Sequence, residues 1–114
     1  MKTLLILTVL SFSQIVLAGT GHFHPTQIVK CSAECTQDDA TGVAAKSLDY
    51  LIQKGKVPSS WSAIPLEKVE KKQFKKGPEW VLTFVDKTQP ANKQRLFVFI
   101  TMKGWLSGSN YTGE

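Results

Sequence analysis

The sequence predicts an α+β fold in which one amphipathic helix packs on a roughly four-stranded antiparallel sheet. Three observations predict it. The 114 residues allow a single domain, one stretch repeats its apolar residues with a helical period, and β-branched and aromatic runs follow that stretch. Short turns separate these runs, which is typical of antiparallel strands. One helix before them can cover only one face of the sheet.

The first 18 residues have the pattern of a secretory signal peptide. Lys2 gives a basic start, residues 4–17 are mostly apolar, and Val16 and Ala18 are the small residues that a signal peptidase requires. The apolar run is shorter than the roughly 20 residues of a membrane-spanning helix. We therefore expect an exported protein, periplasmic or secreted, with no stable membrane insertion after cleavage.

Residues 19–35 are expected to form a flexible leader that contains two histidines and two cysteines. Residues 19–25, GTGHFHP, are rich in types that favour loops. Cys31 and Cys35 follow, and the oxidising environment of exported proteins favours a disulfide between them. In a regular helix, residues four apart are too distant for that bond, so a disulfide requires a loop or a frayed turn. A metal-binding thiolate pair and two inert thiols are the alternatives.

Residues 36–114 are expected to form the folded domain, which begins with a helix over about residues 38–54. Thr36 and Asp39 have the spacing of a capping box. Gly55 fits the left-handed position that ends many helices. Between these ends, small and apolar residues recur with the helical period and form one buried stripe: Ala40, Val43, Ala44, Ser47, Leu48, Leu51 and Ile52.

Four strands are expected after the helix, because four runs with strand composition are separated by turn residues. They span residues 66–74, 80–85, 96–102 and 105–111. Alternation places Leu82 and Val98 on the face that the helix is expected to cover.

The second face of this sheet is also apolar, because Val81 and Phe99 point to it. Two interpretations remain open. The N-terminal segment covers it through Phe23 and Ile28, or it is an exposed patch that binds a protein partner or a second copy of the chain.

His22, His24, Cys31 and Cys35 are the residues whose chemistry fits a metal site. Two imidazoles and two thiolates form a common tetrahedral zinc set, and thiolates also favour Cu(I). A disulfide would remove both thiolates, so the redox state decides between copper or zinc binding and a structural bridge.

The remaining charged residues indicate neither an enzyme nor a nucleic-acid-binding protein. The formal net charge is +5, but the densest basic run has no arginine and no interleaved stacking aromatics, so we expect it to protect an edge strand from aggregation. The run comprises Lys68, Lys71, Lys72, Lys75 and Lys76. No paired carboxylates and no Ser/His/Asp set indicate catalysis. The expected function is that of a non-enzymatic accessory protein.

Several short motifs resemble those of a family of small uncharacterised exported bacterial proteins, often His-rich after the signal peptide. The motifs are the GHxH start at Gly21–His24, then Ser59–Trp61, Glu79–Val81, Leu96–Phe99 and Asn110–Gly113. The predicted helix and strands also resemble the PepSY type of module. The resemblance implies the fold and an exported location. It also implies an alternative function, a protein-interaction or inhibitory module that uses its sheet face, with the two cysteines in a structural disulfide.

Overall fold

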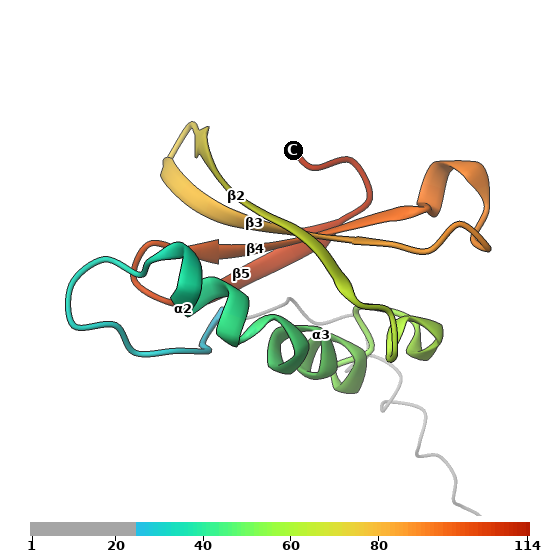
Figure 1. Cartoon of the computed structure of the whole chain (residues 1–114), viewed down its shortest axis with the longest axis horizontal. Coiled ribbons are helices and arrows are strands. Elements are labelled where there is room, and N and C mark those ends of the chain that lie inside the picture. Colours follow the sequence, from blue (N-terminus) through green and yellow to red (C-terminus); the bar gives the residue numbers. More distant parts are fainter. Residues whose placement is uncertain (1–24) are drawn as a thin grey trace, which may run out of the picture.

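A five-stranded antiparallel sheet with two helices on one face makes up residues 25–114, the part of the chain that the computed structural model describes (Figure 1). The order of the strands is β1-β5-β4-β3-β2. The strands are β1 Thr26–Gln27, β2 Leu66–Phe74, β3 Gly77–Val85, β4 Arg95–Thr101 and β5 Trp105–Asn110. The helices are α2 Gln37–Gly42 and α3 Ala44–Gln53, with short 3₁₀ turns η2 Ser59–Trp61 and η3 Ala91–Lys93. The predicted signal peptide, His22, Phe23 and His24 lie outside the described residues.

The α+β class and the meander from β2 to β5 are confirmed, but the expected strand number is wrong. A fifth strand, β1, pairs with β5, with Thr26 opposite Leu106 and Gln27 opposite Trp105. Two residues are too few to show a strand period, so their conformation depends on the neighbouring strand. A side-chain bond adds to this pairing, because the Lys46 ammonium of α3 donates to the carbonyl of Ile28 at 3.3 Å.

The expected single helix is divided into α2 and α3. Val43 separates them with φ −111° and ψ 13°, outside the helical region, and its N–H donates to the carbonyl of Ala40 at 3.2 Å. Gly42 and Val43 are both weak helix formers, and together they interrupt the helix without moving its apolar stripe. The capping box at Thr36 and the left-handed Gly55 (φ 73°) are confirmed.

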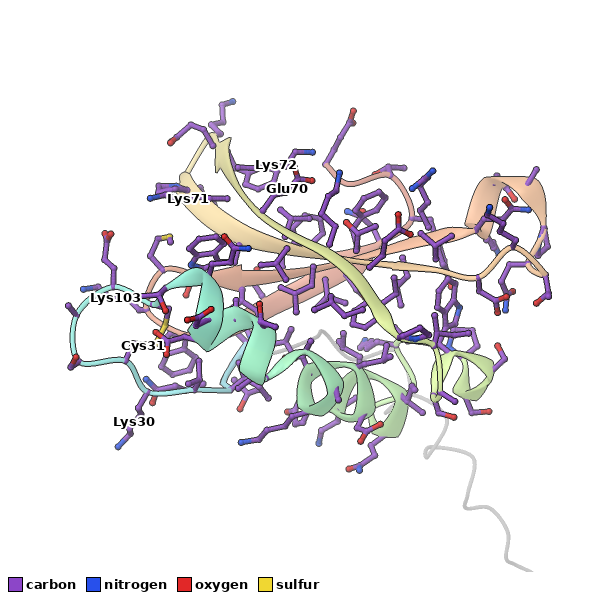
Figure 2. All side chains as sticks on the ribbon, viewed as in Figure 1. Lys30, Cys31, Glu70, Lys71, Lys72 and Lys103 are labelled. Atoms are coloured by element: carbon purple, nitrogen blue, oxygen red, sulfur yellow. A yellow bond between two sulfur atoms is a disulfide. The ribbon has the colours of Figure 1, made fainter. Side chains whose placement is uncertain are left out.

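The hydrophobic core lies between the helices and the face that carries Leu82 and Val98, as the alternation predicts. Figure 2 shows side chains filling the space between the ribbon layers. Trp61 of η2 is completely buried there. The core also includes Ala40, Ala44, Leu48, Leu51, Phe84, Leu96, Ile100 and Leu106. Ile28 belongs to this same cluster, so the interpretation in which it covers the second face is wrong for this residue.

No helix packs on the second face of the sheet within residues 25–114. The aromatic side chains on this face pack against one another, and the C-terminal residues pack on them. Val81 is completely buried, and the rings of Phe74 and Phe99 meet edge to face with centroids 5.7 Å apart. Gly113 packs against Phe97, whose ring would lie 3.4 Å from a Cβ at that glycine. Figure 1 shows the C-terminal segment curling over the side opposite the helices.

Candidate functional site

Cys31 and Cys35 form a disulfide in the loop that precedes α2. The Cα atoms are 5.2 Å apart, and the pair closes a loop of five residues. Cys35 directly precedes the N-cap Thr36, so neither cysteine lies in regular helix and the helical spacing does not oppose the bond. Cys35 is buried, whereas Cys31 is only half-buried. One sulfur of the pair is therefore shielded by the core and the other is close to solvent.

The sheet holds Cys35 in place through both of its backbone groups. Its N–H donates to the carbonyl of Met102 at 2.8 Å, and its carbonyl accepts from the indole Nε1 of Trp80 at 2.9 Å. The second of these bonds is buried and joins residues 45 positions apart in sequence. Strand β3 and the turn that follows β4 thus position the backbone of this cysteine.

The chain before Cys31 is fixed at the turn between β4 and β5. The N–H groups of Ile28 and Val29 both donate to the carbonyl of Gly104, at 2.8 and 3.2 Å. Gly104 has φ +90°, and a Cβ there would lie 2.0 Å from the carbonyl oxygen of Val29. Only glycine fits this close approach of two backbones.

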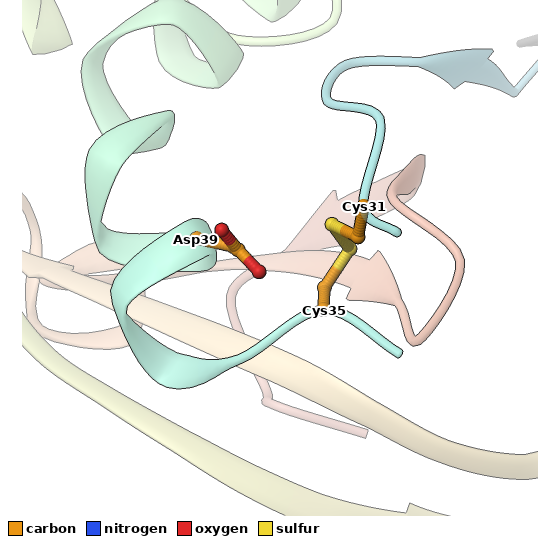
Figure 3. A group of neighbouring side chains, drawn as sticks. All are labelled: Cys31, Cys35 and Asp39. Carbon is orange, nitrogen blue, oxygen red and sulfur yellow. A yellow bond between two sulfur atoms is a disulfide. The ribbon is translucent and has the colours of Figure 1, made fainter. Parts of the chain in front are cut away.

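Asp39 brings a carboxylate to the same place. Its Oδ2 accepts from the N–H of Thr36 at 2.8 Å, and its own N–H donates to the hydroxyl of Thr36 at 3.1 Å. This reciprocal capping box fixes the carboxylate beside the disulfide (Figure 3). A carboxylate oxygen and the two sulfur atoms all lie within 4.8 Å of one another.

The structure therefore brings together two of the four predicted ligands and adds a third donor. Cys31 and Cys35 are adjacent, while His22 and His24 lie outside the described residues. Asp39 was expected only to cap the helix. The signal that could have identified it is the capping box itself, because that motif holds the residue three positions after Thr36 close to the preceding Cys35.

The oxidation state of the cysteines decides what this group can do chemically. In the disulfide, the sulfur atoms are bonded to each other and provide no thiolate ligand. Reduction would leave two thiols and one carboxylate already close together. Two thiolates and an oxygen suit zinc, and the thiolates alone suit Cu(I).

A groove of about 460 Å³ lies on the second face of the sheet. Phe74 and Phe99 are among its lining residues, with Lys75 and Lys76 of the β2–β3 turn, Glu79 and the Ser107–Asn110 part of β5. The Ser107 hydroxyl donates to Glu79 at 3.1 Å, which fixes one wall.

The comparison with protein families agrees with the resemblance to an uncharacterised family. A model of a family of unknown function, DUF6488, matches residues 1–114. The chain belongs to this family. No curated protein and no solved structure matches it. Membership in DUF6488 supplies no reaction or ligand.

Two further observations bear on where this DUF6488 protein works. The Cys31–Cys35 disulfide is typical of proteins in oxidising compartments. Within residues 25–114, no helix has both the length and the apolar character needed to cross a membrane.

Proposed function

We propose that this protein is a small exported accessory protein, not an enzyme, that binds Cu(I) or Zn(II) when Cys31 and Cys35 are reduced. The observation that carries the proposal is the cluster of two sulfur atoms and the Asp39 carboxylate within 4.8 Å. The first 18 residues support a periplasmic or secreted location. The disulfide then acts as the closed form of the site, and a thiol reductant opens it.

The backbone contacts of Cys35 favour binding with little rearrangement. Its N–H and carbonyl are held by Met102 and Trp80, so the backbone of Cys35 keeps these contacts when the disulfide is reduced. Cys31 is nearer to solvent and carries the movement needed to adjust the distance between the thiolates. His22 and His24 are the further proposed ligands: with both thiolates they make the common zinc set, and the Asp39 carboxylate supports zinc from beside the sulfur atoms.

Metal binding should depend on pH, because coordination displaces the thiol protons. Affinity should therefore fall as the pH is lowered. The histidines should contribute less than the cysteines, since ordering a leader segment costs conformational entropy.

The test is a titration of the reduced mature protein, with zinc followed by calorimetry and Cu(I) by competition with a chromophoric chelator. We expect one ion per chain, nearly complete loss in Cys31→Ser/Cys35→Ser, and a smaller loss in His22→Ala/His24→Ala. Asp39→Asn should weaken zinc binding, and Asp38→Asn is its matched control, because Asp38 is exposed on the same turn of α2. Equal binding by the reduced protein and the cysteine-free variant would refute the proposal.

A second candidate function is a PepSY-like protein-interaction or inhibitory module in which the disulfide is purely structural. The groove on the second face supports it, because an aromatic pair and polar walls are common in ligand-binding clefts. Short apolar peptides added to isotope-labelled protein should shift the amide signals of residues 74–79 and 107–110. Absence of these shifts, or shifts spread over the whole domain, would argue against this candidate.

A further inference from the structure

Strand β2 forms a long edge of the sheet with one open side. It has nine residues and pairs only with β3 among the described strands. The two-residue turn Lys75-Lys76 closes the hairpin at the pair Phe74 and Gly77. In such a hairpin the closing pair exchanges its hydrogen bonds, and every second pair repeats this. The backbone groups of Val69, Lys71 and Gln73 therefore point away from β3, toward the open side.

The sequence along this open side is complementary to itself. Around Val69 the chain reads Glu67-Lys68-Val69-Glu70-Lys71. If a second copy of β2 runs antiparallel with Val69 opposite Val69, then Lys68 faces Glu70 on both sides of the axis. Glu67 is left out of this pairing, because β2 has a bulge there: Leu66 pairs with Phe84 and Lys68 with Thr83. Lys68 and Glu70 each meet the opposite charge, and the copies are related by a two-fold axis. An edge protected by lysines alone would repel its own copy.

We propose that two copies of this protein pair through β2 in this register and form one continuous antiparallel sheet. Three independent features agree with the register. The backbone groups of Val69 point outward, so the central Val69 pair can exchange two hydrogen bonds before the bulge at Glu67 interrupts β2. The apolar Val69, which packs on the core, lies on the axis. The charged pairs flank it on both sides.

The charges of Lys68 and Glu70 lie on one face of the sheet. The register of β2 with β3 places Lys68 opposite Thr83 and Glu70 opposite Val81, so both side chains point to the second face. They already form an ion pair within the chain, with Nζ and Oε2 3.5 Å apart. In the pair of copies these become four alternating charges at the two-fold axis. Figure 2 labels Glu70, Lys71 and Lys72 along this strand.

The opposite edge of the sheet stops further growth. Strand β1 has only two residues, and the register of β5 shifts between the partners of Phe99 and Ile100, leaving Ser107 as an extra residue. A strand as short as β1 offers too few backbone groups for edge pairing. The two-fold pairing through β2 is therefore closed, and we infer a dimer rather than a fibre.

The dimer should be weak and sensitive to salt. One pair of strands buries less surface than a standard protein interface, so dissociation should occur on dilution. The four charges are close to solvent, so raising the salt concentration should also favour the monomer. The pairing requires neither a metal nor a ligand in the groove, and it can fail without affecting the proposed function.

Sedimentation equilibrium of the mature, disulfide-bonded protein over a range of concentrations measures the dissociation constant of the dimer. Variants in which the charges of Lys68 and Glu70 are reversed test the proposed register. Lys68→Glu alone and Glu70→Lys alone each place like charges opposite one another, and each should raise the dissociation constant about tenfold. Mixing these two variants should restore association as a heterodimer, because every facing pair is then opposite in sign. The double variant Lys68→Glu/Glu70→Lys should also dimerise.

Lys72→Glu is the control for Lys68→Glu, and Glu34→Lys is the control for Glu70→Lys. Each control makes the same change in net charge as its variant, but at a residue that faces no charge of the second copy. They should leave the dissociation constant within about twofold of the unaltered protein. Circular dichroism establishes that each variant is folded before it is compared. The inference is overturned if the unaltered protein stays monomeric at all concentrations. It is also overturned if the single variants dimerise as well as the controls, or if the mixture fails to associate.

Discussion

The two edges of the sheet end in opposite ways. At one edge, β1 pairs with β5 for only two residues and then leads into a loop held by Gly104, by Met102 and by the disulfide. At the other edge, β2 runs for nine residues with backbone groups that no described strand pairs. The first edge is closed by covalent and backbone contacts, and the second carries charges of both signs.

This difference shows that the two edges of one sheet can have different roles. The closed edge positions the cysteine pair and the capping carboxylate, so its rigidity supports the candidate site. The open edge contributes Leu66 and Val69 to the core and Phe74 to the aromatic pair on the second face, and its charged side chains are available for contacts between molecules. Changes at the first edge should therefore affect stability, and changes at the second should affect association.

The largest effect should come from the core that both edges share. Leu48 of α3 is buried against the sheet, and Leu48→Ala should lower the free energy of unfolding by about 2–5 kcal/mol through lost burial and a cavity. Hydrogen exchange should accelerate at both edges together. Ile52→Ala, at a half-buried position of the same helix, should cost less. An unchanged denaturant midpoint for Leu48→Ala would contradict this packing.

A change at Gly104 should open the closed edge alone. Gly104→Ala adds a Cβ that collides with the Val29 carbonyl and forces an unfavourable φ, so we expect a loss of about 3 kcal/mol. Amide exchange should accelerate in residues 26–35 more than in β2 and β3. Gly42→Ala is the control, because a Cβ there meets nothing within 4 Å and alanine favours helix. Equal stability of the two variants would show that the close approach is unimportant.

Removal of the disulfide should have a somewhat smaller effect at the same edge. Cys31→Ala/Cys35→Ala releases a short loop, which should lower the free energy of unfolding by about 2 kcal/mol on the chain-entropy estimate. Chemical denaturation measures this loss. The β2 edge should keep its dissociation constant in the dimer assay. A change in that constant would mean that the two edges are coupled.

The smallest effect should come from the loop between β3 and β4, which belongs to neither edge. The Thr88 hydroxyl and N–H, with the Gln89 amide, hydrogen-bond the Asp86 carboxylate and hold its pKa below the usual value. A lowered pKa stabilises the fold above the unfolded-state pKa, and this contribution is lost as the pH falls through the folded-state value. Thr88→Ala should raise the pKa of Asp86, which NMR titration measures. An unchanged pKa would assign the shift to another cause.

Local sequence patterns were sufficient for most of the fold. The capping box at Thr36, the helical stripe through Leu48 and the alternation in β3 and β4 all depend on residues close in sequence. The composition predicted the bounds of β2 correctly. The strand ends at Phe74 because Lys75 and Lys76 form the turn that follows. The break at Val43 was missed because the apolar stripe continues in phase across it, although Gly42 and Val43 are weak helix formers.

The sequence by itself determined the α+β class, the helix-covered face and the presence of a cysteine pair with two possible states. Only the tertiary structure decided that Thr26 and Gln27 form a strand, that Ile28 belongs to the core on the helix side, and that Trp80 and Met102 hold the backbone of Cys35. The physical reason is range. Helical and strand periods indicate which side of an element is buried, and they depend on residues close in sequence. The features that the sequence did not predict depend on contacts with Trp80, Met102 and Gly104, which are far from residues 26–35 in sequence and therefore produce no local pattern.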